Sequence, residues 1–293
     1  MGRPGRIKAV QRAALPMMTA RMTFVVCCSL FTVCVTRAAL TAAQNASTIA
    51  FLRSFTVSMP GLANLWTGDD WCTWPYVRCN SDTSIALVID SAGLTGSLPE
   101  LNVSGNGATV ALTEIAVANM NITGGFKSTW GSLRALQALN FTNTNLFGTI
   151  PESWNAMRSL QRVIVKNASA CGSLPSWTLR SLKSIDVSNN MLRGPLPETW
   201  GSIAGMQSVD LTGNSFCGCK PPSWVSRVLT DALFRAMGSA PFDLNCKAPI
   251  NCASEGAKCS RDAPQYRDTA AFPSCVVVAA LSLVVVLISS ISM

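Results

Sequence analysis

Two aspartates, Asp186 and Asp210, occupy equivalent places in two similar segments of the sequence, SIDVSNN and SVDLTGN. If the segments are neighbouring strands, the two carboxylates lie about 5 Å apart, the spacing of strands in a sheet. Paired carboxylates are the catalytic groups of glycosidases, but that chemistry also needs a carboxyl group with a raised pKa. We interpret the pair as solvated carboxylates on an open face.

Histidine is absent from the chain, which excludes Ser-His-Asp and Cys-His catalysis and every metal site that uses histidine. Cys217 and Cys219 stand one residue apart in GNSFCGCKPPSW and could bind zinc together with Cys246 and Cys252. However, the sequence has no Cys-x-x-C pair, and a secreted chain favours disulfides. We therefore predict that the protein is not an enzyme and has no cofactor or metal.

Both ends of the chain are typical of targeting signals. Residues 1–43 combine a basic start, an apolar run over 22–35 and small residues up to Ala43, which predicts a secretory signal peptide cleaved after Ala43. Residues 275–293 are apolar and uncharged and follow the small-residue triplet Asp268-Thr269-Ala270. This pattern predicts a glycosylphosphatidylinositol attachment signal, with Asp268 as the anchored residue. A signal anchor and a transmembrane helix are the alternatives for the two ends.

Removal of the signal peptide changes the charge of the chain. The formal net charge is +8, with 23 basic and 15 acidic residues. Residues 1–43 contain six of the basic residues and none of the acidic ones, which leaves 17 against 15, or +2. Nucleic acid is therefore not an expected partner.

The exported part carries two further signs of a secretory route. Five Asn-x-Ser/Thr sequons predict N-glycosylation at Asn45, Asn102, Asn121, Asn140 and Asn167. An even number of cysteines predicts disulfides among Cys72, Cys79, Cys171, Cys217, Cys219, Cys246, Cys252 and Cys259.

A repeat fills the middle of the sequence. The phrase GSLPE at Gly96 returns as GTIPESW, GSLPSW and GPLPETW, with weaker copies GGFKSTW and GCKPPSW. The glycines recur every 22 to 28 residues, which is the period of leucine-rich repeats, at Gly96, Gly124, Gly148, Gly172, Gly194 and Gly218. Each repeat also has two apolar residues spaced two apart, which predicts a half-buried strand. We predict an α/β solenoid of about six leucine-rich repeats.

Two columns of the repeat predict how it packs. Tryptophans follow the repeat glycine by five or six residues, which predicts a buried column on the convex side, at Trp130, Trp154, Trp177, Trp200 and Trp224. The asparagine that bonds the turn backbone in such repeats is present only as Asn190 and Asn214. In the other repeats we expect backbone bonds or water to close a less rigid turn.

Apolar and cysteine-containing segments at both ends predict the caps that a solenoid needs. Phe51, Leu52, Phe55, Met59 and Leu62 have helical spacing, and Cys72 and Cys79 would close a short loop after them. The segment 223–237 predicts a second helix that buries Trp224, Val225, Val228, Leu229, Ala232 and Leu233. Five cysteines lie in this C-terminal cap, so Cys171 either pairs with one of them or leaves a thiol unpaired.

The predicted organisation has six parts. They are a signal peptide (1–43), an N-terminal cap (44–82), the repeats (83–212), the last repeat turn with a cysteine-rich cap (213–259), a juxtamembrane segment (260–268) and a removed anchor signal (269–293).

The concave strand face is where a solenoid binds its ligand. Its outward residues should be Val88, Ala116, Asn140, Ile164, Asp186 and Asp210, flanked by Asp90, Glu114, Arg162, Lys166 and Ser188. The basic residues beside the acidic ones form a charge step, and the exposed apolar residues add contact area. A glycan on Asn140 would block the middle of this face.

The chain resembles the glycosylphosphatidylinositol-anchored leucine-rich-repeat surface antigens of kinetoplastid parasites, known as promastigote surface antigens. The resemblance rests on FLRSFTVSMPGLANLWTGDDWCTW (51–74), GTIPESW (148–154) and NSFCGCKPPSW (214–224), and covers nearly all of residues 48–259. It implies a coat protein of the outer plasma membrane with a role in host-cell attachment or complement resistance. The Thr/Pro-rich stalk that members often carry is missing from 260–274, which places the domain close to the membrane.

Two functions remain open at this point. The first is recognition of a host surface protein or glycan, complement-related partners included, by a protein held at the membrane through its lipid anchor. The alternative is a coat or immune-shield antigen without a dedicated ligand, which the five sequons and the missing stalk favour.

Overall fold

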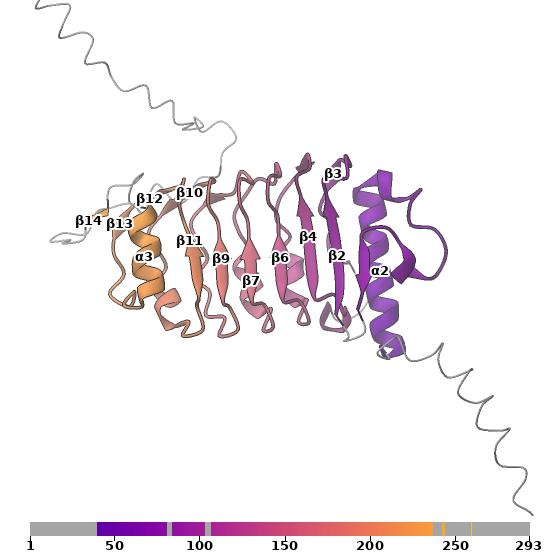
Figure 1. Ribbon diagram of the computed structural model, residues 1–293, viewed down its shortest axis with the longest axis horizontal. Helices are drawn as coiled ribbons and strands as arrows, with labels where there is room; N and C mark the ends of the chain where they lie inside the picture. Colours follow the sequence, from indigo (N-terminus) through magenta and orange to yellow (C-terminus); the bar gives the residue numbers. More distant parts are fainter. Residues whose placement is uncertain (1–39, 81–83, 103–106, 237–241, 244–258, 260–293) are drawn as a thin grey trace, which may run out of the picture.

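The computed structural model describes residues 40–80, 84–102, 107–236, 242–243 and 259, which form a leucine-rich-repeat solenoid (Figure 1). Its main sheet has seven strands in the order β1-β2-β4-β6-β7-β9-β11. The strands are β1 (Val77–Cys79), β2 (Ile85–Asp90), β4 (Glu114–Ala118), β6 (Ala138–Asn140), β7 (Arg162–Ile164), β9 (Ser184–Asp186) and β11 (Ser208–Asp210). All pairs are parallel except β1 with β2, and the predicted fold is confirmed.

The chain returns from each strand through short elements on the other sides of the coil. Small parallel sheets form where the repeat glycines lie, from β3 (Gly96–Ser97), β5 (Ile122–Thr123), β8 (Cys171–Gly172), β10 (Met191–Gly194), β12 (Ser215–Phe216), β13 (Gly218–Cys219) and β14 (Phe242–Asp243). Glycine is required here because all six repeat glycines have positive φ. Single 3₁₀ turns follow in η3 (Gly107–Thr109), η4 (Ser128–Ser132), η5 (Glu152–Ala156) and η6 (Glu198–Ser202).

The five repeat tryptophans are buried in one column and join each repeat to the one before it. Each indole Nε1–H donates to a backbone carbonyl of the preceding repeat at 2.9 to 3.2 Å, for example Trp154 to Lys127 and Trp177 to Pro151. Two pairs of neighbouring rings stack, Trp154 with Trp177 and Trp200 with Trp224, each with centroids 6.2 Å apart. The column therefore supplies both apolar burial and a fixed inter-repeat bond.

The N-terminal cap closes the first end of this column. Helix α2 (Ala42–Ser58) places Phe51 and Phe55 against the ring of Trp130, and η1 (Pro60–Leu62) and η2 (Trp71–Thr73) follow it. Thr41 and Gln44 form a capping box at the start of α2. The predicted cleavage after Ala43 would cut inside this box, so it would remove the Thr41 cap.

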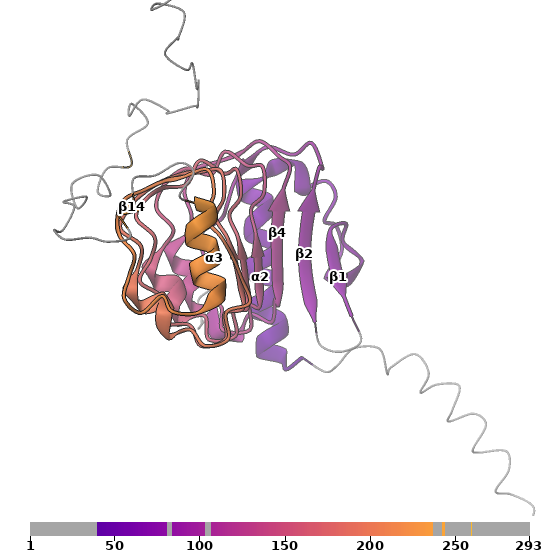
Figure 2. The same cartoon turned by 60° about the vertical axis from the view of Figure 1, so that its left-hand side comes forward.

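The C-terminal cap closes the other end with helix α3 (Arg227–Ala236), which stands across the coil beside β11 (Figures 1 and 2). The helix starts later than the predicted residue 223, because the Ser226 hydroxyl accepts the backbone N–H of Leu229 and ends the preceding turn. Val225 is consequently exposed, so its predicted burial was wrong. Arg235 donates to the carbonyl of Val209 at 2.7 Å, on the last strand of the sheet.

Disulfides fix both caps. Cys72–Cys79 holds the N-terminal cap as predicted, with Cα atoms 5.6 Å apart. Cys171 pairs with Cys259, which answers the question that the odd number of cap cysteines raised. Cys219 is disulfide-bonded as well, while Cys246 and Cys252 lie outside the described residues. The second bridge ties the C-terminal segment back to β8.

Replacement of Trp177 by Phe tests the indole bond. Trp177→Phe keeps an aromatic ring but leaves the Pro151 carbonyl unpaired and a small cavity, so the free energy of unfolding should fall by about 2–3 kcal/mol. Chemical denaturation measures this change. Met157→Leu, a volume-conserving change at a neighbouring buried position, should cost less than about 1.5 kcal/mol. Equal losses in the two variants would show that the indole bond adds nothing.

Removal of the long-range disulfide should be more costly. The bridge spans 88 residues, and closing a loop of that size stabilises the folded state by about 4–5 kcal/mol in the chain-entropy model. Cys171→Ser combined with Cys259→Ser should therefore lower the Tm strongly, as measured by calorimetry. A Tm within one or two degrees of the parent would contradict this.

Candidate functional site

The register of the sheet brings the predicted ligand residues together in one row. Adjacent strands pair Val88 with Ala116, then Asn140, Ile164, Asp186 and Asp210 in turn. We call these six residues the concave row. Asp186 and Asp210 are direct neighbours across β9 and β11, as the sequence predicted.

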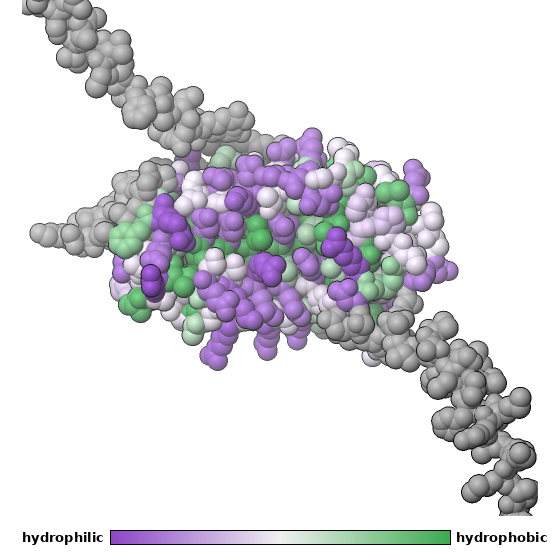
Figure 3. Space-filling model, viewed as in Figure 1, coloured by the Kyte–Doolittle hydropathy of each residue, from purple (hydrophilic) through white to green (hydrophobic). Residues whose placement is uncertain are grey.

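Exposure along the concave row is lower than the sequence suggested. Val88, Asn140, Ile164, Asp186 and Asp210 are each half-buried, because the next repeat covers part of every side chain. Ala116 is only 5 % exposed, so the expectation that it offers apolar contact was wrong. Figure 3 shows the apolar band that results along the middle of this face, between two hydrophilic margins.

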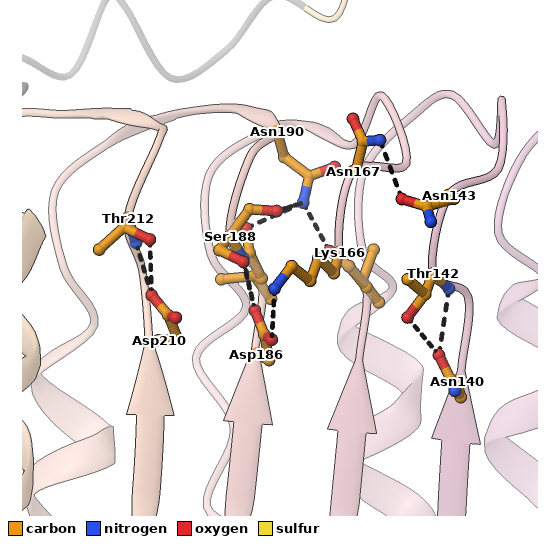
Figure 4. Close-up of polar contacts among 12 residues, drawn as sticks. Asn140, Thr142, Asn143, Lys166, Asn167, Asp186, Ser188, Asn190, Asp210 and Thr212 are labelled. Carbon is orange, nitrogen blue, oxygen red and sulfur yellow. Dashed lines mark hydrogen bonds and ion pairs between the residues drawn. The ribbon is translucent and has the colours of Figure 1, made fainter. Parts of the chain in front are cut away.

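Three members of the concave row bond their own repeat. The Oδ1 atoms of Asn140, Asp186 and Asp210 each accept the backbone N–H and the hydroxyl of the residue two positions on, Thr142, Ser188 and Thr212, at 2.6 to 3.1 Å (Figure 4). An Asx turn of this kind ends a strand by giving its backbone a side-chain partner. One oxygen of each carboxylate is thus already used in the fold.

The flanking residues place basic side chains next to the acidic ones of the concave row. Lys166 Nζ lies 4.0 Å from Asp186 Oδ2, and Arg162 is exposed at the start of β7. Glu114 is half-buried at the start of β4. Ser188 is buried and donates to Asp186, so its expected place on the outward surface was wrong. The face therefore has basic Arg162 and Lys166 beside acidic Asp186 and Asp210 at β7, β9 and β11, while Asp90 and Glu114 add acidic groups at β2 and β4.

A column of asparagines closes the turns after the strands, and the sequence reasoning missed it. Asn119, Asn143, Asn167 and Asn189 all have φ between +49° and +56°, a region that asparagine tolerates better than most residues. Asn167 donates to Asn143, Asn143 to Asn119 and Asn119 to Asp90, at 2.6 to 3.0 Å. We call this chain of four side chains, Asp90, Asn119, Asn143 and Asn167, the asparagine ladder. Its signal in the sequence is the recurrence of asparagine one residue before the expected column.

The two asparagines that stand in the expected column act as predicted. Asn190 Oδ1 accepts the N–H of Ala168 and of Ala170, and Asn214 Oδ1 accepts that of Leu192. Where this asparagine is missing, direct backbone bonds between repeats close the turn, such as Met120 N–H to the Asn143 carbonyl. These backbone bonds and the asparagine ladder together make the turns more rigid than the sequence predicted.

The five sequons lie at different places on the solenoid. Asn140 is in the concave row, while Asn45, Asn102, Asn121 and Asn167 are exposed elsewhere. Asn45 Oδ1 accepts the indole N–H of Trp71, and Asn121 Oδ1 accepts from Asn145. Glycosylation at these positions stays a prediction.

In the described part of the chain, no three His, Cys, Asp or Glu side chains come together as a metal site. The described helices include none that is both long and apolar enough to span a bilayer. Residues 1–39 and 260–293, which contain most of the predicted signal peptide and the whole anchor signal with Asp268, lie outside the described residues.

The asparagine ladder affects the pKa of Asp90, which can be tested by titration. The hydrogen bond from Asn119, followed by that from Ser91, lowers the pKa of Asp90. This carboxylate therefore stabilises the fold above its ordinary pKa, and the contribution is lost as the pH falls through the lowered pKa. Asn119→Gly, which keeps the positive φ that Gly213 shows naturally, should raise the Asp90 pKa in an NMR titration. Asn143→Gly should leave that pKa unchanged; a matching rise there would contradict the direct bond.

Comparison with known proteins supports the fold and a surface setting. Residues 181–203 match the family described as Leucine Rich Repeat. A segment of 102 residues is 28% identical to the surface membrane glycoprotein GP46/M-2 of Leishmania amazonensis, over 34% of this chain and 21% of that protein. The match thus spans about a fifth of that relative.

Among solved structures, the chain is similar to PEPR1 in the PEPR1–AtPEP1 structure, with a TM-score of 0.52 and 20% identity over 62% of this chain and 26% of that one. It is also similar to a plant ice-binding protein, with a TM-score of 0.53 and 22% identity over 62% and 59%. At these identities the likeness concerns the fold alone. The chain is a leucine-rich-repeat solenoid, and its similarity to a surface glycoprotein supports a surface recognition protein.

Proposed function

We propose that this protein is a cell-surface recognition protein that binds a host surface protein or glycan through its concave row, in attachment or complement resistance. It has no catalytic activity, and a glycosylphosphatidylinositol anchor at Asp268 holds it on the outer leaflet. The observation that carries the proposal is the register of β7, β9 and β11, which sets Arg162 and Lys166 beside Asp186 and Asp210 on one open face.

The chemistry of that face suits a polar ligand with some apolar area. Lys166 and Asp186 are 4.0 Å apart with both side chains partly exposed, so a ligand can exchange this weak ion pair for its own contacts. Asp210 Oδ2 has no partner among the described residues, and Ile164 adds an apolar surface between the charges. Since leucine-rich repeats present a continuous concave surface, such a face can bind an extended partner.

The sequon at Asn140 supports the alternative of a shielding coat antigen. Asn140 stands in the concave row between Ala116 and Ile164, so a glycan there would cover the centre of the face. Under this alternative the protein has no dedicated ligand, and its glycans protect the membrane.

Asp186→Asn together with Asp210→Asn tests the recognition function without breaking the Asx turns. Asn140 shows that an amide oxygen can accept the same two hydrogen bonds, so the double variant loses charge but keeps its fold. Because both changes create an Asn-x-Ser/Thr sequon, parent and variants are produced in a host that attaches no N-glycans. We expect its binding to host cells to fall about tenfold or more, as measured with labelled protein by flow cytometry.

The matched control is Asn140→Asp, which removes the sequon and keeps the Asx acceptor. Under the recognition proposal it should bind at least as well as the parent. If neither parent nor control shows saturable binding, the concave row has no cell-surface ligand and the shielding alternative stands.

A further inference from the structure

A row of basic side chains runs along the margin where the strands begin. Arg134, Arg158 and Arg180 each lie four residues before the paired strand residues Ala138, Arg162 and Ser184, so they occupy the same place in three consecutive repeats. All three are exposed, as are Arg162 and Lys183 beside them. We call these five residues the basic rim. Figure 3 shows hydrophilic side chains projecting along this lower margin of the solenoid.

The basic rim has no acidic partner in the part of the chain that the structure describes. None of its five side chains takes part in a salt bridge or a side-chain hydrogen bond there. The loops that lead into β6, β7, β9 and β11 are GSLRALQ, NAMRSLQ, TLRSLK and GSIAGMQ, and none contains Asp or Glu. Glu114, at the start of β4, stands two strands from Arg162 in the register and makes no ion pair with it. The positive charge is therefore available to a partner.

Four of the five sequons lie away from this margin, while Asn45 lies beyond its N-terminal end, near the segment before β4 that bonds Ser47 and Thr48. Asn45 lies on α2, Asn140 in the concave row and Asn167 in the asparagine ladder. Asn102 and Asn121 follow the turns after β3 and β4. Glycosylation at Asn102, Asn121, Asn140 and Asn167 would cover other faces and leave the basic rim accessible.

We propose that the basic rim binds a linear sulfated polysaccharide. The three arginines repeat about every 5 Å, the spacing of neighbouring strands, in single file. Guanidinium groups bind oxyanions through paired N–H bonds, which suits sulfate groups along a chain. Polar Gln137 and Gln161 stand beside them and can bond sugar hydroxyls.

A membrane surface fits the same row less well. The large exposed apolar side chains of the described residues are Val57, Leu65, Val225 and Phe234, and all four lie in the caps. The basic rim thus lacks the apolar side chains that would insert between lipids. Arg162 also flanks the concave row, but Arg134, Arg158 and Arg180 lie outside it, so the proposal does not depend on a ligand of that row.

Heparin tests the proposal with the protein purified as the cell exports it. The variant with Arg134→Gln, Arg158→Gln and Arg180→Gln should leave a heparin column at lower salt than the parent, with a Kd about tenfold higher. The slope of log K against log salt should fall by roughly two, at about 0.7 for each lost contact with a flexible polyanion. All three changes are at exposed positions, and an unchanged Tm shows that the fold is intact.

The matched control removes the same number of positive charges from another region, through Arg53→Gln, Arg78→Gln and Arg227→Gln in or near the caps. It should bind heparin within twofold of the parent. The Asp186→Asn, Asp210→Asn variant should do the same when it and its parent are both made without N-glycans, which separates this surface from the concave row. Desulfated heparin should not bind. Equal binding by the parent and the rim variant, equal loss in the control, or retention on phosphatidylserine vesicles rather than heparin would overturn the proposal.

Discussion

The indole hydrogen bond between repeats is the interaction on which the solenoid depends. A single repeat has one short strand, of three residues in β6, β7, β9 and β11, and it cannot bury an apolar face alone. Each tryptophan fills the space behind its strand and donates to a carbonyl of the preceding repeat, so packing and hydrogen bonding fix the same neighbour distance. A slip of one repeat against the next would unpair a buried donor and an acceptor together, which costs far more than the slip of a purely apolar contact. The strand register, and with it the concave row, follows from this bond.

Much of this arrangement could be predicted from the sequence because its causes repeat. The glycine period, the paired apolar residues and the tryptophan column predicted the strands, the buried side and the neighbours of Asp186. What could not be predicted depends on contacts between segments far apart. The partner of Cys171 is 88 residues away, and nothing local distinguishes it from the other cap cysteines. The low exposure of Ala116 arises from longer side chains on both neighbouring strands, and the late start of α3 from one serine. The asparagine ladder could have been predicted from the recurring asparagines, but these lie one residue before the column expected in such repeats.

The two margins of the sheet differ in chemistry because they differ in backbone geometry. After the strands the chain turns through positive φ, which selects asparagine and glycine, so that margin is polar and internally bonded, with Asp90 as the carboxylate of the ladder. Before the strands the loops adopt ordinary conformations that place no such demand, and long basic side chains occupy them. Side chains that are hydrogen-bonded within the fold have few groups left to bind a ligand, whereas the side chains of the basic rim make no such bonds among the described residues. The margin after the strands therefore stabilises the fold, and the margin before the strands is available to a partner.

The bond from Arg235 to the Val209 carbonyl has a consequence beyond the cap itself. A parallel sheet ends in a strand whose backbone groups are ready to accept another chain, and copies crowded on a surface would meet there constantly. The guanidinium occupies a carbonyl on the last strand, and α3 lies over that edge. At the opposite end the three-residue β1 runs antiparallel and is held near the Cys72–Cys79 bridge, so it offers a short and differently oriented edge. The two ends do not match each other, which prevents the repeats from continuing from molecule to molecule into a fibre.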